Sequence, residues 1–323
     1  MSIDLAFDDG QEAIAQAVAQ LCADVCDEDT VKAATGRFPR ELWSQLAELG
    51  MLAIATPEGE GGALEMVAAM ESLGRAVFPG PLVATFLATQ LLDEADRVEV
   101  IEGRAIVSAG SGELMPWAPC ANLFLEIDGD RVWRAEPTSD VQEIETLGGE
   151  PWGRVDLRRD RELEGGPAAL VFADIALAAY QAAAGSALVA AASEHAAARK
   201  QFGRAIGEFQ AVAHPLADCS MRLSASTALV HNAAFVHDEA EPGPDAGLSA
   251  EVRALASAAR LSANAAALEA VYVCHQVFGA IGITLEGPVF HITRRIRQLA
   301  SQPPGDAASR AGILESIGLP AGG

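Results

Sequence analysis

The order of helical and strand-like segments along the chain limits its fold more than any other feature of the sequence. Apolar residues at helical spacing occupy residues 12–92, and short β-like runs separated by turn signals occupy residues 103–166. Long alanine-rich helical stretches follow from residue 168. This order excludes an alternating βαβ chain. The chain also lacks a Gly-rich phosphate loop between a strand and a helix, which excludes the common nucleotide-binding motifs.

These segments predict a mainly α fold with three domains. Residues 1–102 form an N-terminal helical domain, residues 103–166 a reduced antiparallel β domain, and residues 167–323 a C-terminal four-helix bundle. Within the β domain, Asp128-Gly129 between two apolar runs predicts a hairpin. The long helices are predicted at residues 168–202, 209–238 and 248–278, with a Pro- and Gly-rich linker at residues 241–245.

Charge and composition exclude several classes of function. The chain has 45 acidic against 22 basic residues and a net charge of −23, which disfavours nucleic acid as a partner. The acidic N-terminus has no signal-peptide pattern, so we expect a cytoplasmic protein. The apolar run at residues 167–193 carries Asp174 and Gln181, which indicates a buried helix and no membrane span. Cysteines and histidines lack metal-ligand spacing, so we expect no metal site.

Two basic clusters are candidate anion sites. Residues 199–204 place Arg199, Lys200 and Arg204 at the corner between two helices, where guanidinium groups and a helix N-terminus can hold a diphosphate. The alternative is a solvated helix end whose cations offset the helix dipole. The second cluster combines Arg294, Arg295 and Arg297 with His291. We expect this second cluster either to contact a nucleotide diphosphate or a partner subunit, or to lie on a solvated helix face paired with acidic residues.

Several motifs resemble acyl-CoA dehydrogenases, the flavoenzymes that oxidise acyl-CoA thioesters at the α,β bond. They are Arg-Lys-Gln-Phe-Gly-Arg-Ala-Ile-Gly-Glu-Phe-Gln at residues 199–210, Gln-Val-Phe-Gly-Ala-Ile-Gly-Ile at residues 276–283, and segments at residues 41–52 and 57–75. These motifs span nearly the whole chain and occur in the same order as in the family. The resemblance implies contacts with FAD, bound mainly by a neighbouring subunit, from Arg199, Phe202, Gln210, Gln276, Val277, Phe278, Gly279 and Ala280.

The chain departs from the family where the flavin ring and the base are expected. Residues 108–119 replace the family's Thr-Glu-Pro-x-x-Gly-Ser-Asp segment and Trp-Ile-Thr strand, so we expect that this β unit does not hold the flavin ring. Most members place a catalytic Glu just before a Gly after the last Arg-rich helix, where this chain has Pro303 and Pro304. A minority place it on the helix before Arg199, where Asp174 is the nearest carboxylate and a weak candidate for the base.

The resemblance and its gaps together suggest a subunit of a heteromeric, flavin-dependent acyl-CoA dehydrogenase. It resembles the short, incomplete subunit of heterotetrameric steroid-catabolic enzymes. The implied partners are a longer dehydrogenase subunit, an acyl-CoA thioester with a bulky steroid side chain, and an electron-transfer flavoprotein or similar acceptor. Two alternatives remain: a self-sufficient dehydrogenase that uses Asp174 or Asp306, and a non-catalytic scaffold that binds CoA thioesters.

Overall fold

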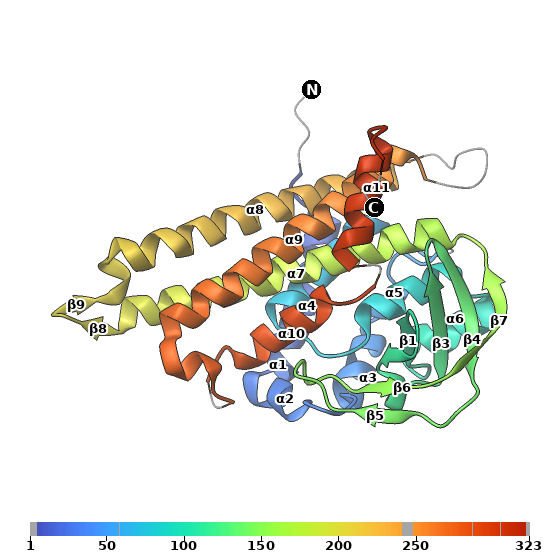
Figure 1. The fold of residues 1–323 in the computed structure, drawn as a ribbon, viewed down its shortest axis with the longest axis horizontal. Helices are drawn as coiled ribbons and strands as arrows, with labels where there is room; N and C mark the ends of the chain where they lie inside the picture. Colours follow the sequence, from blue (N-terminus) through green and yellow to red (C-terminus); the bar gives the residue numbers. More distant parts are fainter. Residues whose placement is uncertain (1–4, 58, 241–247, 286, 304, 321–323) are drawn as a thin grey trace.

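Long helices form an elongated bundle, and the N-terminal helices and the strands pack against one half of it (Figure 1). The computed structural model describes residues 5–57, 59–240, 248–285, 287–303 and 305–320; the predicted linker at residues 241–245 lies outside them. The N-terminal helices are α1 (Asp9–Val25), α2 (Glu28–Ala33), α3 (Arg40–Glu48), α4 (Ala63–Arg75), α5 (Leu82–Leu91) and α6 (Glu94–Ile101). The later helices are α7 (Gly166–Ala198), α8 (Gln210–Asp238), α9 (Ala250–Phe278), α10 (Phe290–Ala300) and α11 (Gly305–Ser316).

The mainly α fold is confirmed, and the long helices lie close to their predicted positions. The largest error is the end of α7, which stops at Ala198 rather than at residue 202. Phe202 and Gly203 have φ angles of +52° and +81°, which a two-residue hairpin turn requires and an α-helix forbids. Residues 200–205 therefore pair as the short strands β8 (Lys200–Gln201) and β9 (Arg204–Ala205).

The strands form two small sheets beside the bundle. One has the order β1-β3-β4-β7 and the other β2-β6-β5. The hairpin predicted at Asp128-Gly129 is confirmed, since β3 and β4 pair antiparallel around it. The unit is mainly antiparallel as predicted, but β1 pairs with β3 in parallel. The strands are β1 (Val107–Gly110), β2 (Leu114–Pro116), β3 (Leu123–Asp128), β4 (Arg131–Pro137), β5 (Gln142–Ile144), β6 (Trp152–Arg154) and β7 (Leu157–Leu163).

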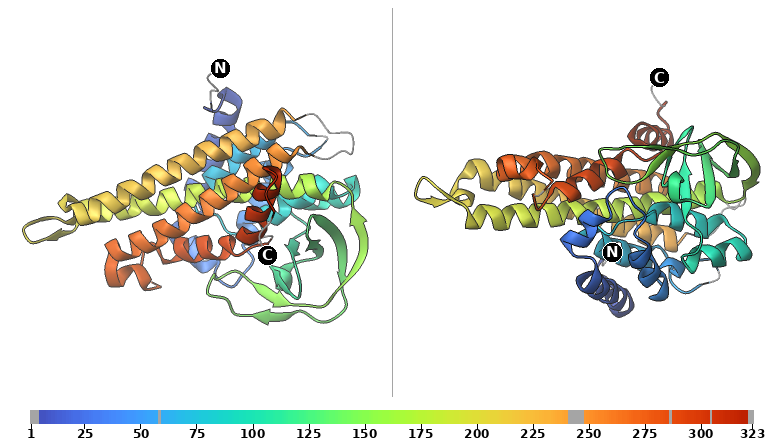
Figure 2. Two further views of the ribbon diagram at one scale, coloured as in Figure 1. Left: turned by 45° about the horizontal axis from the view of Figure 1, so that its top comes forward. Right: turned by 90° about the horizontal axis from the view of Figure 1, so that it is seen from below.

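The change from helices to strands follows α6, and helices return at α7. This order agrees with the segment types read from the sequence. The exact domain boundaries, after residues 102 and 166, stay a prediction. Figure 2 shows the N-terminal helices on one side of the long helices, with the strands at one end of the bundle.

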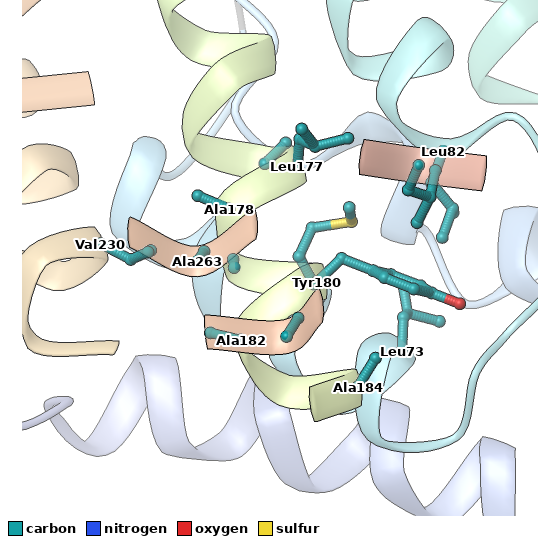
Figure 3. Packing of buried hydrophobic residues seen from close by; sticks show 14 of the residues in the cluster. Leu73, Leu82, Leu177, Ala178, Tyr180, Ala182, Ala184, Val230 and Ala263 are labelled. Carbon is teal, nitrogen blue, oxygen red and sulfur yellow. The ribbon is translucent and has the colours of Figure 1, made fainter. Parts of the chain in front are cut away.

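Helix α7 is the centre of the core. It packs against α4, α5, α8, α9 and α10. Its apolar stretch is long enough to cross a membrane, but 78% of that stretch is buried inside the fold, as expected for a core helix. A second apolar stretch, Ala250–Ile283, is 39% buried. Tyr180 of α7 is 1% exposed and lies among the buried hydrophobic side chains of the core (Figure 3). Its hydroxyl donates to the Phe78 carbonyl oxygen at 3.0 Å.

Small residues set how closely the neighbouring helices approach α7. A Cβ atom on Gly74 of α4 would lie 2.5 Å from the Tyr180 carbonyl oxygen. A Cβ atom on Gly185 of α7 would lie 3.2 Å from Cα of Ala267 in α9. Real Cβ contacts are essentially never as short as the first distance, so a methyl group on Gly74 forces the backbones of α4 and α7 apart. The second distance is tighter than most real contacts, so a methyl group on Gly185 requires a small shift of α9.

We predict that Gly74→Ala lowers the free energy of unfolding by about 1–3 kcal/mol, because the added methyl overpacks the α4–α7 contact. Gly312→Ala in α11 is the matched control, because the nearest atom to its added Cβ lies 3.9 Å away. There the better helix propensity of Ala gives a gain of up to about 1 kcal/mol. Urea unfolding of both variants measures the difference; equal effects would contradict the close-packing argument.

Candidate functional site

The two places where the sequence suggested a catalytic base meet at one buried side chain, Arg260 of α9. Arg260 is 2% exposed and forms an ion pair with Asp174 of α7. Its Nη2 also donates to the carbonyl oxygen of Gln302, and its Nη1 lies 3.4 Å from the carbonyl oxygen of Pro303. One guanidinium thus joins α7, α9 and the turn after α10.

Both carboxylates that were candidates for the base, Asp174 and Asp306, accept hydrogen bonds from other side chains. Burial raises the pKa of the Asp174 carboxyl, and the charge of Arg260 and its hydrogen bond oppose that rise. Asp306 accepts a hydrogen bond from Asn264 at 3.1 Å. The role of Asp174 as a base stays a prediction, but its Oδ1 atom is already bound to Arg260. Sequence reasoning missed Arg260; the only signal was one Arg within an alanine-rich helical face.

The cleft beside this ion pair is nearly closed. It lies between α5, α7 and the strands, and Gly80, Leu87, Trp117, Asp174 and Arg260 are among the residues that line it. Its volume is only about 30 Å³. That is room for only a few water molecules. An acyl chain does not fit there without movement of the surrounding side chains.

The predicted Arg199 corner lies at the opposite end of the bundle from the sheets (Figure 1). Arg199 caps the C-terminus of α7, and Gln210 begins α8; both are exposed. Phe202 at the hairpin tip is 93% exposed and meets Phe209 edge-on, with ring centroids 6.2 Å apart. The Arg204 guanidinium lies 4.0 Å from the Phe209 ring centroid. The corner therefore presents cations and an aromatic ring to the outside.

The structure brings the second predicted loop to the same end of the bundle. Phe278 at the end of α9 packs on His195, one helical turn before Arg199, with ring centroids 4.5 Å apart. Burial lowers the pKa of His195, and the nearby charge of Arg199 lowers it further. Val277 is half-buried beside Phe278. The two motifs, which are about seventy residues apart in the sequence, are therefore neighbours.

The remaining predicted loop residues line a large cavity. Gln276, Gly279 and Ala280 form part of its wall, and its volume is about 880 Å³. Cavities of roughly 300–1,000 Å³ are typical of small-molecule sites. The opposite wall comes from the β5–β6 connection and from α10, whose Arg294 and Arg297 were in the second basic cluster. His291 and Arg295 of that cluster do not line this cavity.

The cavity has the donor groups that a nucleotide cofactor needs. Buried nitrogen atoms of Trp152, His275, Arg294 and Gln298 have no hydrogen-bond partner among the described residues. An unsatisfied buried polar atom costs about 1–3 kcal/mol, so such atoms in a cavity wall indicate a bound polar ligand. The residues present therefore fit the diphosphate-bearing part of FAD.

We predict that Arg260→Met lowers the free energy of unfolding by about 3–5 kcal/mol, because it leaves Asp174 charged, buried and unpaired. Adding Asp174→Asn should recover at least half of the loss. Urea unfolding of the single and double variants measures the coupling. Arg253→Met, at an exposed position on the same helix, is the control and should stay within about 0.5 kcal/mol of the parent. Strictly additive effects of Arg260→Met and Asp174→Asn would contradict the ion pair.

Two protein-family models match the N-terminal and C-terminal parts of the chain. The family model of the acyl-CoA dehydrogenase N-terminal domain matches residues 8–95, and the family model of the C-terminal domain matches residues 168–301. The chain is 28% identical over 309 residues to acyl-CoA dehydrogenase IpdE2 of Mycobacterium tuberculosis. The match covers 85% of this chain and 87% of that protein.

Solved structures share the fold. The ChsE4–ChsE5 complex of Mycobacterium tuberculosis has a TM-score of 0.83 at 19% identity, covering 98% of this chain and 99% of the other. A variant of the Tcur3481–Tcur3483 steroid ACAD has a TM-score of 0.79 at 21% identity, covering 95% and 97%. PigA with FAD and proline has a TM-score of 0.81 at 18% identity, covering 98% and 100%. Since the two domain models together match more than half of the chain, in the family's order, the chain belongs to the acyl-CoA dehydrogenase family of oxidoreductases.

Proposed function

We propose that this chain is the short subunit of a heteromeric acyl-CoA dehydrogenase that oxidises the α,β bond of an acyl-CoA thioester. A longer partner subunit supplies the acyl pocket and the base, and this chain supplies contacts to the diphosphate of a shared FAD. The observation that carries the proposal is the closed cleft at Arg260. The two positions at which the family resemblance suggests a base, Asp174 and the turn at Pro303, are joined here by Arg260 through an ion pair and hydrogen bonds, beside a cleft of small volume, which supports a base from another subunit.

The exposed residues at the β8–β9 end of the bundle support a role for this chain in binding the cofactor across a subunit interface. Arg199, Phe202 and Gln210 are exposed, in or beside the β8–β9 hairpin, and this hairpin lies far from the two sheets formed by β1 to β7 (Figure 1). A chain of net charge −23 needs locally concentrated cations to receive an anionic cofactor. Guanidinium groups bind diphosphate oxygens in a planar fork, and backbone N–H groups of the Gln276–Ala280 loop can add further donors.

The related structures support the heteromeric assembly and the cofactor. ChsE4–ChsE5 is a complex of two different chains, and Tcur3481–Tcur3483 is named as a steroid ACAD. PigA, which has the same fold, binds FAD. From the steroid ACAD we infer a bulky steroid side-chain CoA as substrate. The electron-transfer flavoprotein or similar acceptor is proposed from the family resemblance, and the cytoplasmic location from the sequence.

The chemistry divides between the two subunits. FAD, when bound, accepts the hydride from the β-carbon. Removal of the α-proton needs a positioned, free carboxylate. In this chain Asp174 is held by Arg260, so its charge is neutralised and its oxygen is not free to approach a substrate. The proton therefore goes to a carboxylate of the partner subunit.

Expression of this chain alone should give colourless or insoluble protein, because the exposed corner lacks its partner. Co-expression with the longer subunit should give a soluble yellow complex with about one FAD for each pair of subunits. Absorbance at the flavin band, divided by the protein concentration, measures the ratio. A yellow and active homo-oligomer of this chain alone would contradict the proposal and favour a self-sufficient dehydrogenase that uses Asp174 or Asp306.

Arg199→Ala in the co-expressed complex should weaken FAD binding at least tenfold, because it removes a charge-assisted contact worth about 1.5–3 kcal/mol. Arg253→Ala is the matched control, since this arginine is exposed on α9 outside both basic clusters, and it should leave FAD binding unchanged. FAD retention during gel filtration, followed by equilibrium titration, measures both variants. Unchanged FAD affinity in Arg199→Ala would favour the non-catalytic scaffold instead.

A further inference from the structure

The segment just before α1 contacts the second half of α8. We call residues 5–8 the N-terminal strap. The Phe7 ring packs against the main core and stacks on the His231 ring of α8, with ring centroids 4.5 Å apart and an interplanar angle of 26°. The Leu5 carbonyl oxygen lies 2.7 Å from Nδ1 of the same ring. One histidine therefore makes both contacts that hold the strap on α8.

His231 faces a hydrogen-bond acceptor at each of its ring nitrogens. Its Nε2 atom lies 2.8 Å from Oε1 of Glu71 in α4, opposite the contact with the Leu5 carbonyl. A carbonyl oxygen only accepts hydrogen bonds, and so does an ionised carboxylate. A neutral imidazole has a single N–H, so it satisfies one acceptor and turns a lone pair toward the other. Both contacts together require one further proton, carried by the ring or by Glu71.

The proton lies in a site that holds little water. His231 is 9% exposed and Glu71 is 5% exposed. Burial acts against the charge of the ring, but the hydrogen bonds to Glu71 and Leu5 and the charge of Glu71 together raise the pKa of His231. The stacked Phe7 ring also favours a cation beside it. Loss of the proton leaves a buried lone pair facing a carboxylate, which disfavours the docked strap.

Other charged groups of these elements have partners of their own. Arg75, one turn after Glu71 on α4, pairs with Glu71 Oε2 at 2.8 Å, and its charge acts against the proton on His231. Asp8 of the strap caps the start of α1. Asp238, two turns further along α8, accepts hydrogen bonds from the first backbone N–H groups of α4. The proton on the ring therefore depends mainly on Glu71.

The direction of the pH effect follows from the pKa of His231. The docked strap raises this pKa above its ordinary value of 6.5, so the ring contributes its full stabilisation below that value. The contribution is lost as the pH rises through the raised pKa. Asp8 belongs both to the strap and to the cap of α1, so release of the strap also loosens the first turn of that helix.

We propose that the N-terminal strap is a pH-dependent latch, closed on α8 by one proton shared between His231 and Glu71 and opened by the loss of that proton at alkaline pH. The latch decides whether residues 5–8 cover the contact between α4 and α8. It is independent of the proposed function, because His231 and Glu71 line neither the large cavity nor the cleft at Arg260.

Hydrogen exchange read by mass spectrometry tests the latch in the full-length protein, alone or in its co-expressed complex. Protection of the backbone amides of residues 8–12 is corrected for the intrinsic effect of pH on exchange. It should fall about tenfold between about pH 6 and about pH 9, as expected for the loss of one charge-assisted hydrogen bond. His231→Gln should give low protection at both pH values. His214→Gln, at an exposed position on the same helix, is the matched control and should keep the pH dependence of the parent.

Glu71→Gln separates a proton latch from simple packing. Its amide donates to Nε2 of the neutral His231 ring, while Nδ1–H of that ring donates to Leu5, so both contacts survive without the extra proton. The strap should therefore stay protected at about pH 9 in this variant. Equal corrected protection of the parent at both pH values would overturn the inference. So would a fall of the parent's size in His231→Gln or in Glu71→Gln.

Discussion

Close packing around α7 is the constraint on which the rest of the structure depends. Alanine and glycine residues let α4, α8 and α9 approach this helix closely enough to bury it from most sides. A helix without a polar face cannot exist alone in water, so the other layers must cover it. The short side chains also fix the helix spacing closely, and that spacing decides which residues of α7, α9 and α10 can meet across the core.

A few buried charged groups then join the layers. Arg295 of α10 pairs with Glu150 of the strand region and donates to the Gly80 carbonyl at 2.8 Å, while Arg260 connects α7 and α9 with the turn after α10. Each is costly to disrupt because a lone buried charge is left behind. The two pairs hold the cleft at α7 closed and the β5–β6 connection against α10. The same framework thus closes one site and supports the wall of another.

Local patterns predicted the helices and the β3–β4 hairpin well, since apolar spacing and Asp128-Gly129 act over short distances. They failed at α7's end, where the left-handed turn at Phe202 and Gly203 overrides helix propensity. The Arg199 and Gln276 motifs were found by resemblance, and their assigned contacts stay predictions. The Arg260 bridge and the Trp152 and Gln298 wall could not be predicted, because these contacts join residues far apart in the sequence through packing that no local pattern encodes.

The hairpin tip has a consequence for the life of the protein in the cell. Phe202 holds a left-handed backbone conformation at the tip of the β8–β9 hairpin, with its ring almost wholly exposed. Such a feature is a target for chaperones and proteases until another surface covers it. Copies made in excess of a covering subunit would be removed first. With the proposed longer subunit as that covering surface, the abundance of this chain would follow the supply of that subunit more closely than its own rate of synthesis.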